Sequence, residues 1–190
     1  MAKKSRVWDG TAWQELASAQ TDLTPYSTTA QMNTAIDAGV GLVPILTQTI
    51  GTAVSSVVVT NAFSATYENY KIVISGGVAS TGANLGLKLG ATATGYYAGH
   101  LETAYNSGTV AGSANNNTTS WSFTGYGSTL GLSFNVDLIN PFLTNPTLMT
   151  SLNRFGGGLL NNSTSYTDFT ITPASGTITG GTIQVYGYKK

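Results

Sequence analysis

His100 is the only histidine of the chain and lies in the segment Tyr96-Tyr97-Ala98-Gly99-His100. A histidine base supports nucleophilic catalysis when it lies beside an activated serine and an orienting carboxylate. The chain has no Gly-x-Ser-x-Gly motif, and the nearest approach to one, Gly125-Tyr126-Gly127-Ser128, has the wrong spacing. We therefore expect His100 to be a structural or surface residue.

Paired carboxylates are the second kind of chemistry to consider. Beyond residue 40 the acids are Glu68, Glu102, Asp137 and Asp168, and they are scattered along the chain, with Asp137 at the expected end of a strand. A glycosidase needs two carboxyl groups at a defined separation across the scissile bond, and nothing in this spacing predicts such a pair. We expect most of these acids to be exposed and the protein not to be an enzyme.

Metal and phosphate sites are not predicted either. One histidine and no cysteine exclude the usual zinc sites, and no calcium loop occurs. Gly39-Val40-Gly41 and Gly156-Gly157-Gly158 lack the other residues of nucleotide-binding loops, so we interpret both as flexible connections. We expect neither a metal nor a cofactor.

A group of aromatic and amide residues is better suited to recognition than to catalysis. Aromatic faces stack on sugar rings, and Asn or Thr side chains hydrogen-bond to sugar hydroxyls without needing charge. The candidates for glycan contact are Tyr96, Tyr97, Tyr105, Asn115, Asn116, Asn117 and Tyr126. Tyr96 and Tyr97 are adjacent, so on a strand they point to opposite faces. Trp121 alternates with Phe123, which favours a core position for Trp121.

Composition restricts the function further. Only 8% of the 190 residues are charged and the formal net charge is zero, while 30 Thr, 18 Ser, 14 Asn and 23 Gly dominate the chain. Nucleic-acid binding needs a basic stripe, and membrane insertion needs about 20 consecutive apolar residues. Neither pattern is present, and no apolar segment follows the first cations as it would in a secretory signal. We expect a folded protein with an uncharged surface rich in hydroxyl and amide groups.

Residues 1–40 differ from the remainder and are interpreted as an attachment segment. Five of the eight cations are at the chain ends, namely Lys3, Lys4, Arg6, Lys189 and Lys190, which either solubilise the termini or dock onto a neighbour. Asp9-Gly10 lies between segments that carry Trp8 and Trp13 and predicts a hairpin with a type I′ turn. A possible capping box at Thr28 and Gln31 predicts a short helix that ends near Gly39. Alone this helix would be marginal, so it packs either on its own chain or on its counterparts in neighbouring subunits.

Residues 41–190 predict a mainly-β domain. Short segments of β-branched or alternating apolar residues are separated by Gly and Asn turns, which is typical of an antiparallel β-sandwich or jelly roll. The expected strands are 42–50, 54–60, 70–74, 85–89, 120–124, 130–138, 148–155, 166–172, 177–179 and 182–188. The last two flank Gly180-Gly181, which predicts a second hairpin.

Two parts of the chain resemble structural proteins of tailed bacteriophages. Phe63-x3-Tyr67-x2-Tyr70-x-Ile72-x-Ile74, with the later Leu85-x-Leu87-Lys88-Leu89 and the Tyr96-Tyr97 pair, is similar to the opening of phage minor tail and fibre domains. The ending from Gly181 to Lys189 is similar to their C-terminal strand. The start, Val7 to Trp13 and Tyr26-Ser27-Thr28-x-x-Gln31-Met32, also resembles the start of phage fibre proteins. The resemblance covers about 60 positions, and residues 103–170 match no pattern of the family.

The resemblance implies a particle protein whose N-terminal part docks to the virion and whose β-rich part projects outward, commonly as a trimer. We therefore expect a short tail fibre or tail-tip component on the phage surface that contacts host surface glycans. Lys3, Lys4, Arg6, Trp8 and Trp13 are the candidates for docking onto other virion proteins. The alternative is a capsid decoration or head-fibre protein, and a small polysaccharide-degrading enzyme is a third class.

Overall fold

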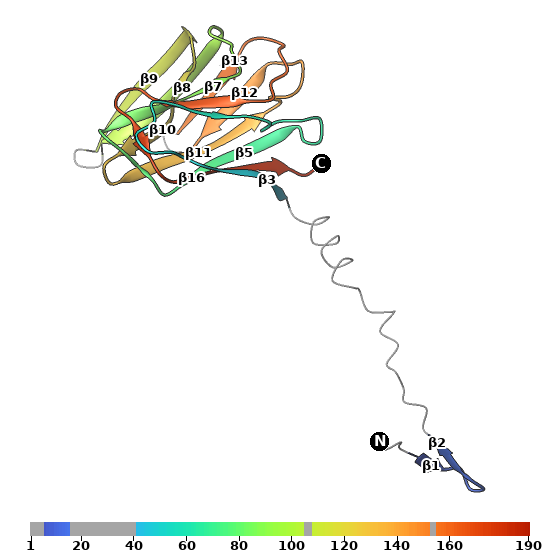
Figure 1. Ribbon diagram of the computed structural model, residues 1–190. Helices are drawn as coiled ribbons and strands as arrows, with labels where there is room; N and C mark the ends of the chain where they lie inside the picture. Colours follow the sequence, from blue (N-terminus) through green and yellow to red (C-terminus); the bar gives the residue numbers. More distant parts are fainter. Residues whose placement is uncertain (1–5, 16–40, 105–107, 153–154) are drawn as a thin grey trace. The chain divides into compact units, whose positions relative to one another are not determined.

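The computed structural model describes residues 6–15, 41–104, 108–152 and 155–190 (Figure 1). The chain divides into two compact units, Met1–Val40 and Gly41–Lys190, and each is described by itself. The helix expected after Thr28 lies outside the described residues, as do Lys3, Lys4 and Tyr105.

The first unit contains the expected hairpin, with a different turn. Strand β1 (Arg6–Trp8) pairs antiparallel with β2 (Trp13–Glu15), and Trp8 lies opposite Trp13. This register leaves four residues, 9–12, in the loop, so the two-residue type I′ turn predicted from Asp9-Gly10 is wrong. The carboxylate of Asp9 accepts hydrogen bonds from the backbone N–H groups of Thr11 and Ala12, both at 2.8 Å. A single aspartate thereby closes a wider loop than the dipeptide pattern indicates.

The second unit is built from strands that all pair antiparallel, which confirms the prediction of a mainly-β sandwich. No helix occurs among the described residues, and so none that is long and apolar enough to span a membrane. The strands are β3 (Leu42–Thr49), β4 (Val57–Val59), β5 (Asn69–Ser75), β6 (Val78–Ala79), β7 (Ala83–Leu89), β8 (Tyr96–Ala104), β9 (Thr109–Thr118), β10 (Trp121–Ser128), β11 (Gly131–Ile139), β12 (Thr147–Ser151), β13 (Gly156–Leu160), β14 (Phe169–Pro173), β15 (Ile178–Thr179) and β16 (Thr182–Tyr188).

Strand β11 is the point at which the sheet divides. One edge of β11 pairs with β5, which leads through β16 to β3. The other edge is shared, because residues 131–134 pair with β10 and residues 136–139 pair with β12. From β10 the sheet continues through β7 and β14 to β4, and from β12 it continues through β13 and β8 to β9. Figure 1 shows these strands as layers that enclose the core.

The interior is filled by the inward residues of the alternating strands, as the pattern predicts. Burial alternates residue by residue along β5, β7 and β16, and the buried positions are almost all Leu, Ile, Val and aromatic residues. Trp121 is fully buried, which confirms its predicted core position. Its ring makes an edge contact with Tyr96 at 5.0 Å between centroids, and its indole N–H donates to the backbone oxygen of Tyr97 at 3.2 Å.

The glycine run of β13 was predicted as a flexible connection, and this prediction is wrong. Gly156, Gly157 and Gly158 form a strand between β12 and β8. A Cβ atom on Gly158 would lie 2.6 Å from Nε1 of Trp121, and one on Gly156 would lie 2.6 Å from the Cβ of His100. Glycine is present because these side chains lie against the backbone of β13.

The predicted hairpin at Gly180-Gly181 is also wrong, because β15 and β16 do not pair with each other. Strand β15 pairs with β6, and β16 pairs with β3 and β5. The two glycines have φ values of 66° and 88° and lie against Gly76 and Gly77, which have φ values of 71° and 77°. Gly76-Gly77 joins β5 to β6, and Gly180-Gly181 joins β15 to β16. Because glycine adopts positive φ without strain, both connections bend at the same level, and the two-stranded pair β5–β16 continues beyond the bend as the pair β6–β15.

Several strands differ from their predicted ranges. The expected strand 54–60 is shortened to β4, with Val54 forming only an isolated bridge to Ile178. The expected strand 148–155 ends at Ser151. Strands β8 and β9 were not predicted, although their pair is the longest hairpin of the described chain.

Candidate functional site

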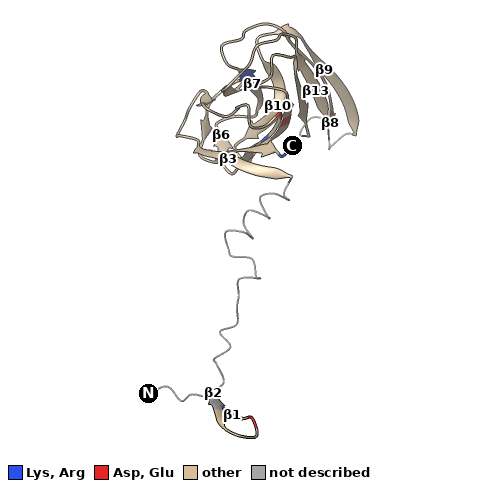
Figure 2. Ribbon diagram, turned by 90° about the vertical axis from the view of Figure 1, so that its right-hand side faces the viewer, with Lys and Arg blue, Asp and Glu red and all other residues tan. Residues whose placement is uncertain are grey.

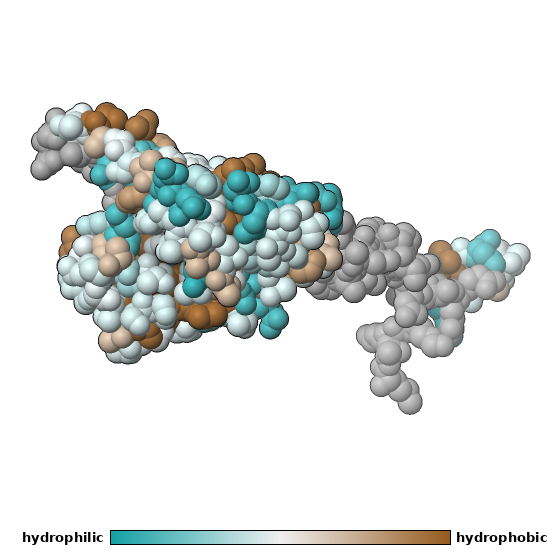
Figure 3. Space-filling model, turned by 90° about the horizontal axis from the view of Figure 1, so that it is seen from above, coloured by the Kyte–Doolittle hydropathy of each residue, from teal (hydrophilic) through white to brown (hydrophobic). Residues whose placement is uncertain are grey.

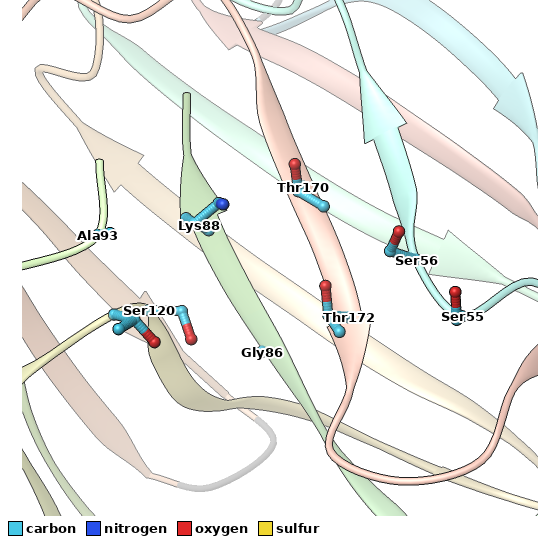
Figure 4. A pocket seen from close by; sticks show the side chains of 9 residues that line it. Ser55, Ser56, Gly86, Lys88, Ala93, Ser120, Thr170 and Thr172 are labelled. Atoms are coloured by element: carbon cyan, nitrogen blue, oxygen red, sulfur yellow. The ribbon is translucent and has the colours of Figure 1, made fainter. Parts of the chain in front are cut away.

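A shallow groove crosses the outer face of β7 and β14 (Figure 4). Its volume is about 530 Å³. The lining residues are Ser55, Ser56, Gly86, Lys88, Ala93, Thr119, Ser120, Thr170 and Thr172, and we refer to this set as the β7–β14 groove. It contains six hydroxyl groups, one ammonium group and no aromatic side chain.

The sheet register explains why these residues gather. On β7 the outward residues Gly86 and Lys88 alternate with the buried Leu85, Leu87 and Leu89. Thr170 lies opposite Lys88 and Thr172 lies opposite Gly86, so both threonines share the outer face of β7. Figure 4 shows Lys88 and Thr170 projecting side by side from the two strands.

Gly86 forms the low point of the groove. A Cβ atom there would lie 3.3 Å from the backbone oxygen of Trp121 and 3.5 Å from the hydroxyl of Ser120. Because Gly86 has no side chain, the turn that carries Thr119 and Ser120 can approach β7 closely and form one wall. The loop before β4, with Ser55 and Ser56, lines another part of the groove.

The polar groups of the groove are not used by the fold. Within the described part of the chain, none of the six hydroxyl groups makes a hydrogen bond to another protein group, and Lys88 makes no ion pair. Some other hydroxyl groups of the sandwich are engaged internally, and the buried hydroxyl of Thr124, for example, donates to the oxygen of Leu85 at 2.7 Å. Hydroxyl groups both donate and accept hydrogen bonds, and an ammonium group adds three donors and a positive charge. The groove can therefore bind a hydroxyl-rich ligand that carries an anionic group.

Tyr126 lies on the same outer face as the groove. It is opposite Asn84 of β7. Asn84 is two residues before Gly86, so about 7 Å along the strand separates Tyr126 from the groove residue Gly86. The side chain is 41% exposed, and its hydroxyl lies over Gly82. Among the predicted glycan contacts, Tyr126 is the one that the sheet register places near the groove.

Two of the predicted glycan contacts, Tyr96 and Asn115, are buried and cannot contact a glycan. Tyr96 is fully buried, and its hydroxyl accepts a hydrogen bond from the N–H of Leu89 at 2.8 Å. Burial also raises the pKa of the Tyr96 phenol above its ordinary value, so it stays protonated. Asn115 is 8% exposed because both ends of its amide bind Ser122: the NH2 group donates to the Ser122 hydroxyl, and the amide oxygen accepts from the Ser122 N–H.

The other predicted contacts that the structure describes, Tyr97, Asn116 and Asn117, are at least partly exposed and are not among the residues that line the groove. Tyr97 is half-buried and points to the face opposite Tyr96, as the alternation of a strand requires. Asn116 and Asn117 are exposed, and Asn117 has a φ of 53° and accepts a hydrogen bond from the N–H of Gly95 at 2.8 Å. Asn117 thus has a local role at the end of β9, because asparagine tolerates this backbone conformation better than most residues.

The predicted docking residues that the structure describes are exposed. Arg6 is in β1, and Trp8 and Trp13 are 51% and 63% exposed with their ring centroids 5.6 Å apart. The hairpin therefore presents a pair of tilted indole rings on one face, while the exposed Val7 lies on the opposite face. Such a surface can pack against an apolar partner.

The charged residues of the sandwich are few, as Figure 2 shows. Asp137 was predicted at a strand end, but it lies within β11 opposite Lys71, with 3.2 Å between its carboxylate and the ammonium group. The hydroxyl of Tyr188 donates to the same carboxylate at 2.6 Å. The pKa of Tyr188 is raised to about 12. Partial burial is the largest cause, and the hydrogen bond to Asp137 and the negative charge of Asp137 add to it. Glu68 pairs with Lys190 at 3.1 Å, so this terminal lysine also contacts the sandwich.

His100 is buried, and its ring lies against Phe123 at 4.0 Å between centroids. This position agrees with its expected structural role. Among the described residues no group of three or more His, Asp or Glu side chains is placed to hold a metal ion.

The groove was not predicted from the sequence, because the sequence shows only that Lys88, Thr170 and Thr172 alternate with apolar neighbours, and not that β7 and β14 are adjacent.

Comparisons with protein-family models, with curated proteins and with solved structures found no match to this chain.

Proposed function

We propose that this chain is a non-enzymatic structural protein of a tailed-phage particle, namely a short tail fibre or tail-tip component. In this proposal residues 1–40 attach it to other virion proteins, and the β-sandwich is displayed on the particle as a homotrimer. The displayed surface contacts glycans of the host. The family resemblance of the sequence supports the phage assignment, and the division of the chain at residue 40 is compatible with separate attachment and display.

The observation that carries the glycan part of the proposal is the β7–β14 groove. Its six hydroxyl groups and Lys88 have no described protein partner, so they are available to hydrogen-bond to a ligand without loss of internal bonds. Tyr126 offers an aromatic ring on the same face. Carbohydrates present many hydroxyl groups and apolar C–H faces, which match these two features.

Lys88 points to the chemical class of the glycan. An ammonium group near the end of β7, without a carboxylate partner among the described residues, favours a ligand with a negative substituent. We expect a surface polysaccharide that carries carboxylate or phosphate groups. One weak contact of this kind per chain suffices, because copies in an oligomer multiply binding through effective concentration.

Binding of the full-length chain to an array of bacterial surface polysaccharides tests this function. We expect binding to acidic glycans, a roughly tenfold loss of affinity in Lys88→Gln, equivalent to about 1.4 kcal/mol, and no change in the control Lys190→Gln. Thr170→Val should also weaken binding, whereas Thr60→Val, at an exposed threonine outside the groove, should not. Absence of binding to every glycan, or wild-type affinity in Lys88→Gln, would contradict the assignment of the groove.

Two further measurements address the biological role. Saturating purified protein should compete with adsorption of the phage to its host, and a lack of inhibition would count against host contact. Incubation with the bound polysaccharide should release no reducing sugar. Measurable turnover would overturn the proposal that the protein is not an enzyme.

A further inference from the structure

The β8–β9 hairpin extends beyond the rest of the sandwich as a two-stranded ribbon. Strand β13 pairs with β8 only from Tyr96 to His100, whereas β8 and β9 pair with each other as far as Ala104 and Thr109. The segments Leu101–Ala104 and Thr109–Gly112 therefore have no third strand beside them among the described residues. A two-stranded ribbon in water is marginally stable unless it packs on something else.

One face of this ribbon carries no charged residue and is apolar except at Thr103, which pairs with Val110. Residues that are opposite one another in an antiparallel pair share a face, and the register pairs Leu101 with Gly112 and Gly99 with Ala114. Val110 follows on the same face of β9, and Phe155 precedes the Gly156–His100 pair and so lies beside Leu101. We refer to Gly99, Leu101, Val110, Gly112, Ala114 and Phe155 as the ribbon face.

The large side chains of the ribbon face are strongly exposed. Leu101 is 54% exposed, Val110 is 62% exposed and Phe155 is 71% exposed. Five of the six residues of the face, together with His100 and Ser113, line a surface hollow of about 460 Å³. In Figure 3 hydrophobic residues gather at the end of the molecule that carries this hairpin.

Phe155 is held in this position by an uncommon backbone conformation. Its φ is 41°, in the left-handed region that bulky residues seldom adopt. For a bulky residue this conformation marks a turn or local strain, and here it leaves the ring exposed beside Leu101.

The unpaired outer edge of β9 also favours an interface at this hairpin. No described strand pairs with the outer edge of β9, and eight of its ten residues are exposed. Natural edge strands are usually short or are protected by Lys or Pro. Strand β4 has three residues and β3 contains Pro44, but β9 has ten residues without Lys, Arg or Pro.

We propose that copies of this chain associate with one another through the ribbon face. In a cyclic assembly the residues near the rotation axis meet their own counterparts, so that surface must be compatible with itself. A charged patch would repel its copies, whereas the ribbon face has no charge and its glycines allow close approach. The absence of charge disfavours an acidic or basic partner, and we therefore assign this face to a second copy of the chain. The proposal rests on the homotrimer of the proposed function, whose contact surface it locates, and it is independent of glycan binding in the groove.

The mass of the full-length chain in solution provides the first test. Sedimentation at micromolar concentration should give a mass above the 19.7 kDa of one chain, and Val110→Lys should reduce it to that of a monomer. The matched control is Leu130→Lys, because Leu130 is 96% exposed in the turn between β10 and β11 and should leave the assembly intact. A monomeric wild-type protein, or an unchanged mass in Val110→Lys, would overturn the proposal.

A second variant keeps the test decisive if Val110→Lys fails to fold. The chain has no cysteine, so Leu101→Cys introduces a single thiol on the ribbon face. Disulfides form when the two Cα atoms are within about 7 Å. The proposed assembly places Leu101 next to the rotation axis, so mild oxidation should link two chains in Leu101→Cys but not in Leu130→Cys. Equal cross-linking of both variants, or of neither, would refute the assignment of the interface.

Discussion

Replacement of Gly158 by alanine distinguishes two interpretations of the glycine run in β13. If Gly156-Gly157-Gly158 were a flexible connection, alanine would restrict the unfolded chain and stabilise the protein by about 0.4–1 kcal/mol. In the structure, however, the new Cβ would lie 2.6 Å from Nε1 of Trp121, 2.8 Å from its Cδ1 and 2.8 Å from the oxygen of Tyr97. The two interpretations therefore predict effects of opposite sign.

The magnitude follows from overpacking of a fully buried site. Trp121 is 0% exposed, and it contacts Tyr96 and donates to the oxygen of Tyr97, so it has little freedom to move. Inserting a methyl group into such a site costs about 1–3 kcal/mol. For a domain of this size each kcal/mol lowers Tm by about 2–4 °C, so we expect a decrease of about 2–12 °C.

Gly157→Ala is the matched control in the same strand. A Cβ atom there meets only the oxygen of Met149, at an ordinary 3.5 Å, so we expect a neutral or slightly stabilising effect. Urea unfolding followed by tryptophan fluorescence and circular dichroism gives both free energies, with an unchanged m-value as evidence that the native state is intact. If Gly158→Ala were as stable as Gly157→Ala, the packing of Trp121 against β13 would be refuted.

Three further predictions concern other parts of the chain. Tyr188 has a native pKa of about 12, above its ordinary 10.0, so between these pH values the native state retains a proton that the unfolded state releases. The free energy of unfolding should therefore fall as the pH rises from 10 to 12. Urea titrations of Tyr188→Phe should show a smaller fall. An equal pH dependence in both proteins would contradict the raised pKa of Tyr188. Thr124→Val should cost about 1–3 kcal/mol in urea unfolding, because it leaves the oxygen of Leu85 without its buried partner, and a neutral effect would disprove that role. Asp9→Ala should abolish the circular-dichroism signal of the coupled Trp8 and Trp13 rings by opening the loop, and persistence of that signal would show that Asp9 does not close the hairpin.

The sequence was most informative where apolar and polar residues alternate. Leu85, Leu87 and Leu89 on β7 and Phe134, Val136 and Leu138 on β11 are buried as their spacing predicts. In these strands the side chains themselves determine which face is inside, so the pattern is sufficient to locate the strand and its core face.

Strands β8, β9 and β13 could not be predicted in this way. They are rich in Gly, Ala, Ser and Asn, and their strand conformation depends on pairing with neighbours rather than on their own side chains. The same limitation explains why Asn115 was assigned to the surface: its burial depends on Ser122, which only the fold places beside it.

The Gly180-Gly181 turn illustrates a related limitation. The pair was predicted to close a hairpin; it does adopt positive φ values and bend the chain, but the strand that follows pairs with β3 and β5 and not with β15. Local sequence identifies a change of direction, whereas the partner of the next strand depends on distant residues. The β7–β14 groove was missed for this reason, since its lining comes from segments between residues 55 and 172.

Antibody labelling of intact phage particles that carry this chain tests the central claim most directly. Because the β-sandwich is proposed to be displayed on the tail, gold particles bound to antibodies against the full-length chain should mark the tail or its tip. Labelling confined to the head, or no labelling of intact particles, would contradict the account.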